Sequence, residues 1–295
     1  MKKKIIISSS GGETSAKMAI EYLKENNLNP IAVYGSKGKP KYWKHVNDYI
    51  EAVVVICNTT REDNRTLKFV KNLDDHLNLH HVWLEAKVLH GKRKSSSYII
   101  TSYAKAKRDG SVFEQVIKKY GIPNTKFLHC TRELKMNPIK SFMKDIGFED
   151  AFTAIGYRYD EPKRVNLITA NIKKQFYPQY EKKVIKRDVK YFWSKQPFKL
   201  GLLEFEGNCR LCYKKSKRKL LSQIITDPNS VNWVFEMQKL YSKGEVHTFF
   251  RENETIQDLI KQSTEDFVMW TPIQQIEFDF DLDEQEDCTE SCEPF

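Results

Sequence analysis

Long hydrophobic runs are absent from this sequence of 295 residues. No apolar stretch approaches the ~20 residues that a membrane-spanning helix requires, and no signal peptide pattern precedes Ile5. We therefore expect a soluble, cytoplasmic protein that makes no membrane contact. Disulfides are rare in that compartment, so the six cysteines favour metal binding or redox chemistry over structural cross-links.

Two common nucleotide-binding motifs are also missing, the phosphate-binding loop G-x-x-x-x-G-K-[ST] and the dinucleotide motif G-x-G-x-x-G. In their place SSSGGETSA, residues 8–16, follows the β-branched run Ile5–Ile7 and precedes apolar residues at helical spacing. This pattern predicts a strand, a loop and a helix. Gly11 and Gly12 permit close approach of a ligand, and the N–H groups of the helix start make an anion site. The alternative is an ordinary Ser/Gly turn before a capped helix.

The charge of the chain is unevenly distributed. Its formal net charge is +10, but residues 277–295 carry nine acidic side chains and no basic one. The rest of the chain therefore has 49 basic against 30 acidic residues, a formal charge of +19. Such a basic body favours phosphates as ligands, from a nucleotide to a nucleic acid. The alternative is an ordinary solvated, lysine-rich surface.

Strand-like and helical segments alternate along the chain, which predicts an α/β fold with a parallel sheet and helices on both faces. The strand-like runs are Ile31–Tyr34, Val53–Cys57, Val82–Glu85 and Phe152–Ile155, and the helical patterns include Leu67–Leu77 and Ser111–Tyr120. Ligands of such sheets bind outside the carboxyl ends of the strands. We therefore expect the loop after Ile7, CNTTRE (residues 57–62) and GYRYDEPKR (residues 156–164) to open at one crevice.

No internal repeat or low-complexity linker divides the chain. We expect a nucleotide-binding α/β domain over residues 1–200, with a boundary near Pro197–Gly207. Residues 201–276 should form a smaller, mostly helical extension that carries a C-x-x-C pair and a basic run, and residues 277–295 an acidic, cysteine-containing tail.

The SSSGGETSA loop resembles the S-G-G-x-x-S loop of the PP-loop superfamily. Two more segments resemble its phosphoadenylyl-sulfate (PAPS) reductase-like branch: CNTTREDNRTLKFV, and AIGYRYDEPKR with its G-x-R-x-[DE]-[ESP]-x-x-R pattern. The resemblance implies a Rossmann-like (HUP/PP-loop) fold and an adenine nucleotide, ATP or PAPS, whose anionic oxygens meet arginine forks. The residues that it implies for nucleotide binding are Ser8, Ser10, Gly11, Gly12, Thr14, Ser15, Asn58, Thr59, Arg158 and Arg164.

CTRELKMNPIKSF, residues 130–142, resembles the C-C-x-x-x-K-x-x-P-[LI] segment of iron–sulfur adenylyl-sulfate reductases. Cys130 and Lys135 occupy matching positions, and the resemblance implies a metal ligand at the first and a catalytic role at the second. Thr131 stands where that family has its second cysteine. A cluster at this site would therefore have three protein thiolates unless another cysteine joins it.

Cys209 and Cys212 form the C-x-x-C pair within GNCRLCYKKSKRK. Two thiolates at this spacing can reach one metal ion or one cluster, and four sulfurs are the usual complement for zinc or a four-iron cluster. The reductase-like layout joins this pair to Cys130. A thioredoxin-type redox pair and two simple buried cysteines are the alternatives.

The tail segment DCTESCEPF holds the last two cysteines. Either could complete the metal site, and we take Cys288 as the fourth ligand and Cys292 as the catalytic nucleophile that the PAPS reductases carry near this position. Their E-C-G signature is absent here, so a sulfur relay or a pair without a role stays open. Cys57 lies in an apolar run and should be a packed core thiol, and the histidines form no metal-binding pattern.

Three functions fit these features. The first is reduction of an adenylylated sulfur compound, and the second is ATP-dependent sulfur transfer beside a four-iron four-sulfur cluster, with zinc as the alternative metal. The third is a zinc-stabilised adaptor that binds a nucleotide without catalysis. The candidate partners are an adenine nucleotide, a nucleic-acid acceptor and a second copy of the chain, as a homodimer. Glu13 stands where the reductase branch commonly has lysine, and its charge should weaken phosphate binding.

Overall fold

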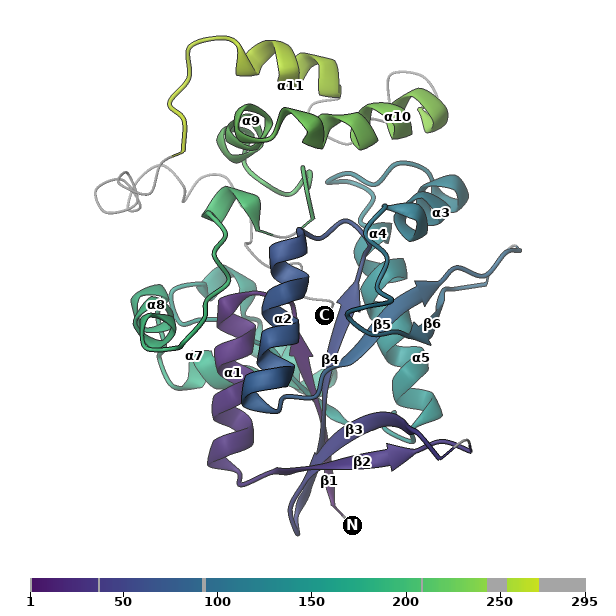
Figure 1. The fold of residues 1–295 in the computed structure, drawn as a ribbon, viewed down its shortest axis with the longest axis vertical. Helices are drawn as coiled ribbons and strands as arrows, with labels where there is room; N and C mark the ends of the chain where they lie inside the picture. Colours follow the sequence, from purple (N-terminus) through teal and green to yellow (C-terminus); the bar gives the residue numbers. More distant parts are fainter. Residues whose placement is uncertain (1, 37, 92–93, 208, 243–253, 271–295) are drawn as a thin grey trace.

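A computed structural model describes residues 2–36, 38–91, 94–207, 209–242 and 254–270 of the chain (Figure 1). The predicted acidic tail, with Cys288 and Cys292, lies outside the described residues. The fold is α/β, with a sheet of eight strands. The strands are β1 (Lys3–Ser9), β2 (Asn29–Tyr34), β3 (Pro40–Val46), β4 (Ile50–Asn58), β5 (Val82–Lys87), β6 (Ser97–Ile100), β7 (Phe152–Ala154) and β8 (Gln175–Phe176).

The middle of the sheet consists of five parallel strands in the order β5-β4-β1-β7-β8. β1 lies at its centre, where Ile5, Ile6 and Ile7 are all fully buried. A run of β-branched residues suits this position because a central parallel strand is covered on both faces. The arrangement is that of a Rossmann-like fold, in which the chain builds outward first on one side of β1 and then on the other.

The predicted parallel sheet is correct for these five strands and wrong for the sheet as a whole, which is mixed. Ile31–Tyr34 does form a strand, but β2 runs antiparallel to β3, and β3 runs antiparallel to the start of β4. The connection between β2 and β3 is a short hairpin, too short for the crossover that parallel neighbours need. β6 is likewise antiparallel to β5.

Helices cover both faces of the sheet, as predicted. Alternate residues of the central strands point to opposite faces, so Ile5, Ile7 and Val54 pack with α1 (Glu13–Glu25), α2 (Asn64–Leu77) and α8 (Lys186–Ser194). Ile6, Val53 and Val55 pack on the other face with α5 (Asn137–Asp145). The predicted helical pattern Leu67–Leu77 lies within α2, which starts at the capping carboxylate of Asp63.

The second predicted helix, Ser111–Tyr120, is α3. The remaining helical segments are α4 (His129–Thr131), a π-helical turn η1 (Arg132–Met136), α6 (Leu167–Ile172), α7 (Pro178–Glu181), α9 (Lys217–Thr226), α10 (Val231–Tyr241), α11 (Ile256–Ser263) and the 3-10 turns η2 (Pro162–Arg164), η3 (Glu204–Glu206) and η4 (Pro228–Ser230). Within the described ranges, no helix has the length and apolarity needed to cross a membrane.

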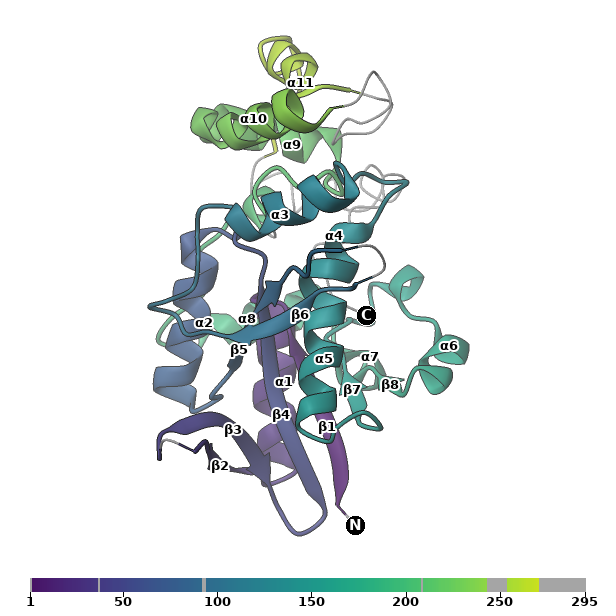
Figure 2. The ribbon, with the colours of Figure 1, turned by 90° about the vertical axis from the view of Figure 1, so that its right-hand side faces the viewer.

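The helices α9, α10 and α11 lie together beyond the carboxyl edge of the sheet (Figures 1 and 2). Their apolar residues do not form a core of their own. They share one hydrophobic cluster with α3 and with Ala86 and Val88 at the end of β5. The segment that carries the C-x-x-C pair is therefore held directly above the sheet edge where ligands bind in this class of fold.

His45 in β3 gives the protein a specific dependence of stability on pH. The side chain is buried, its Nε2 lies 2.8 Å from the Leu79 carbonyl oxygen, and burial lowers its pKa from 6.5 to about 4. Folded His45 is therefore neutral between pH 6.5 and 4 while the unfolded chain takes up a proton, so stability falls as the pH drops through this window. We expect this group to remove about 2 kcal/mol of unfolding free energy between pH 7 and pH 5.

Urea unfolding of the wild type and of His45→Gln at these two pH values measures the effect. The amide variant cannot titrate, so its stability should fall by less than that of the wild type. An equal fall in both proteins would contradict the assignment.

Candidate functional site

The first candidate site lies where the chain changes direction around β1. From β1 the chain proceeds to β4 on one side and returns later to β7 on the other, so the loops leaving the carboxyl ends of β1 and β7 diverge and open a crevice between them. The resulting pocket, called here the switch-point pocket, holds about 1000 Å³ of space including its open mouth.

The loop from Ser10 to Ser15 forms one wall of this pocket. Ser10 is tied to the first turn of α1, since its N–H donates to Ser15 Oγ at 3.1 Å and the two hydroxyl oxygens lie 2.9 Å apart. Gly11 has a φ of +83°, and a Cβ there would lie 2.6 Å from Thr66 Cγ2. The residue must therefore be glycine for two reasons, backbone conformation and contact with α2. Gly12 caps α1 without a side-chain hydrogen bond, which leaves the helix N-terminus turned to the pocket.

Gly156 brings the second wall against the first. A Cβ at this position would lie 2.8 Å from Ser15 Cα and 3.2 Å from Ser15 N, both backbone atoms. Only glycine permits such an approach of the segment after β7 to the start of α1. The contact fixes where the following arginines lie relative to the loop.

Arg158 and Arg164 both line the pocket and are held by carboxylates of their own segment. Arg158 Nε donates to Asp160 Oδ1 at 2.8 Å, and Arg164 Nη1 donates to Glu161 Oε1 at 2.8 Å. Arg158 Nη1 also lies 3.4 Å from Thr14 Oγ1, which connects it to the loop. The two guanidinium groups are thus oriented in advance at the rim of the crevice.

α8 contributes two further cations, Lys186 and Lys190, which sequence reasoning missed. Lys190 Nζ lies 3.3 Å from Glu13 Oε2, and the Leu200 N–H donates to the other oxygen of this carboxylate at 3.4 Å. The charge of Glu13 is therefore compensated within the protein. This pairing offsets the repulsion that we expect between Glu13 and a bound phosphate.

The structure brings most predicted nucleotide-binding residues to the switch-point pocket: Ser10, Gly11, Gly12, Thr14, Ser15, Arg158 and Arg164. Ser8 and Asn58 do not line it. Ser8 is buried within β1, and the Asn58 amide donates to Glu85 Oε1 at 2.7 Å and to the Lys107 carbonyl at 2.8 Å. These bonds connect the end of β4 to β5 and to the loop before α3, so the Asn58 side chain has a structural role.

A second pocket, the cysteine pocket, brings Cys130, Cys209 and Cys212 together. Thr59 lines this pocket, and its hydroxyl lies 3.1 Å from Cys209 Sγ. Cys130 Sγ lies 3.1 Å from the hydroxyl of Tyr213, which also lines the pocket. Cysteines from two distant parts of the sequence thus line one pocket.

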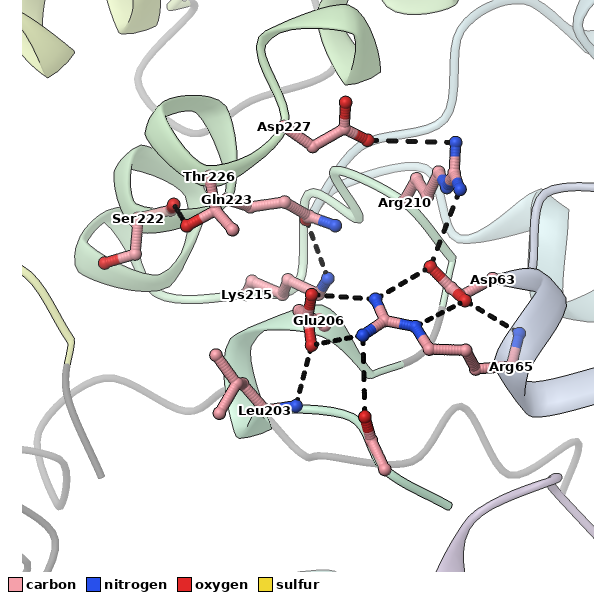
Figure 3. A network of polar contacts seen from close by, with 11 residues as sticks. Asp63, Arg65, Leu203, Glu206, Arg210, Lys215, Ser222, Gln223, Thr226 and Asp227 are labelled. Atoms are coloured by element: carbon pink, nitrogen blue, oxygen red, sulfur yellow. Dashed lines mark hydrogen bonds and ion pairs between the residues drawn. The ribbon is translucent and has the colours of Figure 1, made fainter. Parts of the chain in front are cut away.

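A polar network holds the segment with the C-x-x-C pair against α2 and α9 (Figure 3). The Arg65 guanidinium lies between Asp63 and Glu206, at 3.0 and 2.7 Å, and these two carboxylates raise the pKa of Arg65. Arg210, between the two cysteines, reaches the second oxygen of Asp63 at 3.5 Å. On the other side, Gln223 Oε1 accepts the Leu211 N–H at 3.0 Å. The loop is therefore fixed at several points.

Lys135 lies on the boundary between the two pockets and lines both. It belongs to the π-helical turn η1, a local irregularity of the kind that often marks functional sites. Glu62 lies on the same boundary: its carboxylate accepts the Thr59 N–H and hydroxyl at 2.9 and 2.8 Å. Burial raises the pKa of Glu62, while Lys135 and the bonds from Thr59 act in the opposite direction. Glu62 is the last residue of the segment CNTTRE, and the sequence alone assigned it no role.

Arg61 is a further residue that sequence reasoning missed. Its guanidinium lies 4.3 Å from the centre of the Trp233 ring and lines the cysteine pocket. Two of its nitrogens, Nε and Nη2, are buried and have no hydrogen-bond partner in the described part of the chain. Burial lowers the pKa of Arg61 to about 10, and the neighbouring Cys209 opposes this shift. Buried donors without a partner are rare in proteins, and an anionic group bound in this pocket would satisfy these two.

The three thiols could bind a metal ion or cluster as thiolates, and the buried guanidinium could offset their negative charge. In the described residues, however, no three His, Cys, Asp or Glu side chains stand close enough to hold a metal ion as they are arranged. The remaining predicted ligand, Cys288, and the predicted nucleophile Cys292 lie outside the described part of the chain. Cys57 is a buried core thiol, as predicted, and burial raises its pKa to about 12.

Asp74, His81 and Ser9 form a chain of hydrogen bonds that has the order of a hydrolase triad. His81 Nδ1 lies 2.6 Å from Asp74 Oδ1, and Nε2 lies 3.1 Å from Ser9 Oγ. Burial alone would raise the pKa of Asp74, but His81 and the bonds from His81 and Trp83 lower it. Ser9 is only 4% exposed and lines neither pocket described above. This chain of hydrogen bonds therefore connects the end of β1 to the start of β5, which is a structural role.

Among curated proteins, the chain is similar to the uncharacterized nin region protein ORF290 of Escherichia phage lambda, with 36% identity over 109 residues. The matched region covers 37% of this chain and 36% of that protein. The chain thus matches little more than a third of the length of this relative. No family model matches the chain, and no solved structure matches it significantly.

Proposed function

We propose that the protein binds an adenine nucleotide in the switch-point pocket and uses it in sulfur chemistry at a Cys-ligated centre in the cysteine pocket. The observation that carries the proposal is the position of Lys135, which lines both pockets at once. A group bound at the end of the nucleotide would meet this cation at the boundary. We propose that the chain belongs to the PAPS reductase-like branch of the PP-loop superfamily and has its HUP-type fold.

In this proposal the phosphates, or the sulfate of PAPS, lie against the loop Ser10–Ser15 at the start of α1. The backbone N–H groups there attract anions because the helix N-terminus carries a partial positive charge. Arg158 and Arg164 supply charge-assisted hydrogen bonds from the opposite wall. Lys186 adds a further positive charge at the mouth.

The proposed centre uses Cys130, Cys209 and Cys212 as protein ligands, with Cys288 as the fourth. If Cys288 is not a ligand, an iron–sulfur centre held by the other three thiolates would keep a position for a sulfur atom, whereas zinc more often takes a fourth protein ligand and stays structural. The buried Arg61 guanidinium would compensate the negative charge of the thiolates, since two of its nitrogens have no hydrogen-bond partner among the described residues.

Two reactions use such an arrangement. In sulfur transfer, the protein would use ATP to adenylylate a carbonyl oxygen of an acceptor such as a nucleic-acid base, with release of pyrophosphate. A cluster held by the cysteines would supply the sulfur chemistry by which sulfur replaces that oxygen and AMP leaves. In reduction, the Cys292 thiolate would attack the sulfur of an adenylylated sulfate and release the nucleotide, and a thiol reductant would then displace sulfite and form a disulfide. Lys135 would hold the anionic reacting group in both. A zinc-stabilised nucleotide-binding adaptor without catalysis is the second candidate, favoured by the absence of the E-C-G signature from the sequence.

Calorimetric titration with ATP, AMP, adenylyl sulfate and PAPS tests the proposal. Preference for ATP favours sulfur transfer, and preference for a sulfated nucleotide favours reduction. Binding of a nucleotide to protein that holds zinc and turns over none of the four favours the adaptor. If none of the four ligands binds, the proposed function is wrong.

A further inference from the structure

A third cavity lies apart from the two pockets, in a notch at the edge of the sheet. β3 pairs with the start of β4, through His45 and Val46, whereas β5 pairs with its end, from Val55 to Asn58. The space between β3 and β5 holds about 910 Å³ including its open side. We call it the aromatic notch, because six of the residues that line it carry aromatic rings: Tyr42, Trp43, His80, His81, Trp83 and Tyr103.

Most of these rings are held in place by the protein. The Trp43 and His80 rings stack with their centres 4.2 Å apart and an angle of 12° between their planes. His80 has a φ of +47°, a left-handed conformation that few non-glycine residues adopt. The Trp83 indole N–H donates to Asp74 Oδ2 at 3.0 Å, and Tyr103 contacts the Trp83 ring edge to face. Binding of a stacked ligand here would therefore cost little conformational entropy, because the rings are already ordered.

The charge around the notch is positive. Lys41 lines it from β3, and the loop that follows β6 carries Lys105, Lys107 and Arg108, all exposed. The carboxylate of Asp74 also lines it, but both oxygens already accept hydrogen bonds from His81 and Trp83. A ligand with flat rings and negative charges fits this combination.

We propose that the aromatic notch binds a base of a single-stranded nucleic acid, while Lys41 and the basic loop contact the backbone phosphates. Aromatic platforms flanked by cations bind single strands in this way, because every base has a face that stacks. Bases of a duplex are already stacked on each other and cannot reach the rings. The inference goes beyond the proposed nucleotide chemistry and does not depend on it.

Fluorescence anisotropy tests this inference with the full-length protein and labelled single strands of about 16 nucleotides, oligo-dT and oligo-rU, beside a duplex of equal length. We expect the protein to bind a single strand more tightly than the duplex. The two single strands show whether DNA or RNA is preferred. No binding of either single strand at low salt, or equal binding of the duplex, would overturn the inference.

Two substitutions separate stacking from charge. Trp43→Ala should lower the affinity for the single strand about 10- to 100-fold without changing its dependence on salt, because the indole carries no charge. Lys41→Ala should reduce the slope of log affinity against log salt by about 1. Trp43→Phe should keep most of the affinity, and Phe235→Ala, which removes an exposed ring of α10, should behave as wild type.

The test stays decisive if Trp43→Ala does not fold. Tyr103→Ala removes a ring of the same notch from a loop and should lower the affinity in the same way. A folded notch variant with wild-type affinity for the single strand would contradict the inference. Adenine-nucleotide affinity, measured on the same variants, should not change, so failure of this inference and failure of the proposed function are distinguishable.

Discussion

Adenine-nucleotide affinity should fall at least about 100-fold when Gly12 is replaced by valine, because hydrogen bonds from backbone N–H groups to a charged ligand contribute about 1.5–3 kcal/mol each. The added side chain would project at the start of α1, where the phosphates are proposed to lie. The fold should tolerate the valine side chain at this position. A Cβ at Gly12 would lie 3.5 Å from its nearest neighbour, Ser10 Oγ, and the backbone φ is −95°, which any residue adopts.

Two other glycines serve as controls for this experiment. Gly35→Val places the same side chain in the β2–β3 connection, where the nearest atom to an added Cβ is 3.7 Å away, and should leave the affinity unchanged. Gly11→Ala should destabilise the protein itself, because of the positive φ and the close contact with Thr66. Calorimetry with far-UV circular dichroism separates these cases. Wild-type affinity in a folded Gly12→Val protein would refute the location of the nucleotide.

Protein purified without oxygen from iron-supplied cells should be brown and contain iron and acid-labile sulfide, and Cys209→Ala should lose both. The proposed centre has only three described cysteine ligands, so removal of one leaves too few thiolates to hold a cluster. Cys57→Ala is the matched control. This cysteine is buried among the sheet residues that pack on α5 and does not line the cysteine pocket, so its removal should leave the iron content unchanged.

Substitution of the two distal cysteines extends the test. If Cys288→Ser loses the cluster, Cys288 is a ligand, and if the iron content and spectrum persist, the centre has an open position suited to sulfur delivery. If Cys292 is the nucleophile, Cys292→Ser should keep the iron and lose the reduction of the adenylylated sulfur compound. Colourless wild-type protein that holds one zinc per chain would exclude the cluster and favour the adaptor.

Local patterns in the sequence were sufficient to predict the elements that depend on local physics. The buried strand Ile5–Ile7, the glycine loop after it, and the helices α2 and α3 follow from β-branched runs, glycine and 3.6-residue periodicity. The packing of helices on both faces of the sheet also follows, from the alternation of strand-like and helical segments. The meeting of Cys130 with the C-x-x-C pair was predicted only through the family resemblance, because no local pattern relates residues so far apart.

Tertiary structure alone decided the composition of the two pockets and of the aromatic notch. Lys186 and Lys190 reach the switch-point pocket because α8 packs on α1 and α2, and Glu62 and Arg61 reach the boundary and the cysteine pocket through the turn after β4. Asn58 has the residue type expected of a ligand, yet Glu85 from the neighbouring strand takes its amide. The direction of β2 likewise depends on pairing with β3. Such outcomes depend on which distant partner is nearest once the core has formed, and one-dimensional spacing does not contain that distance.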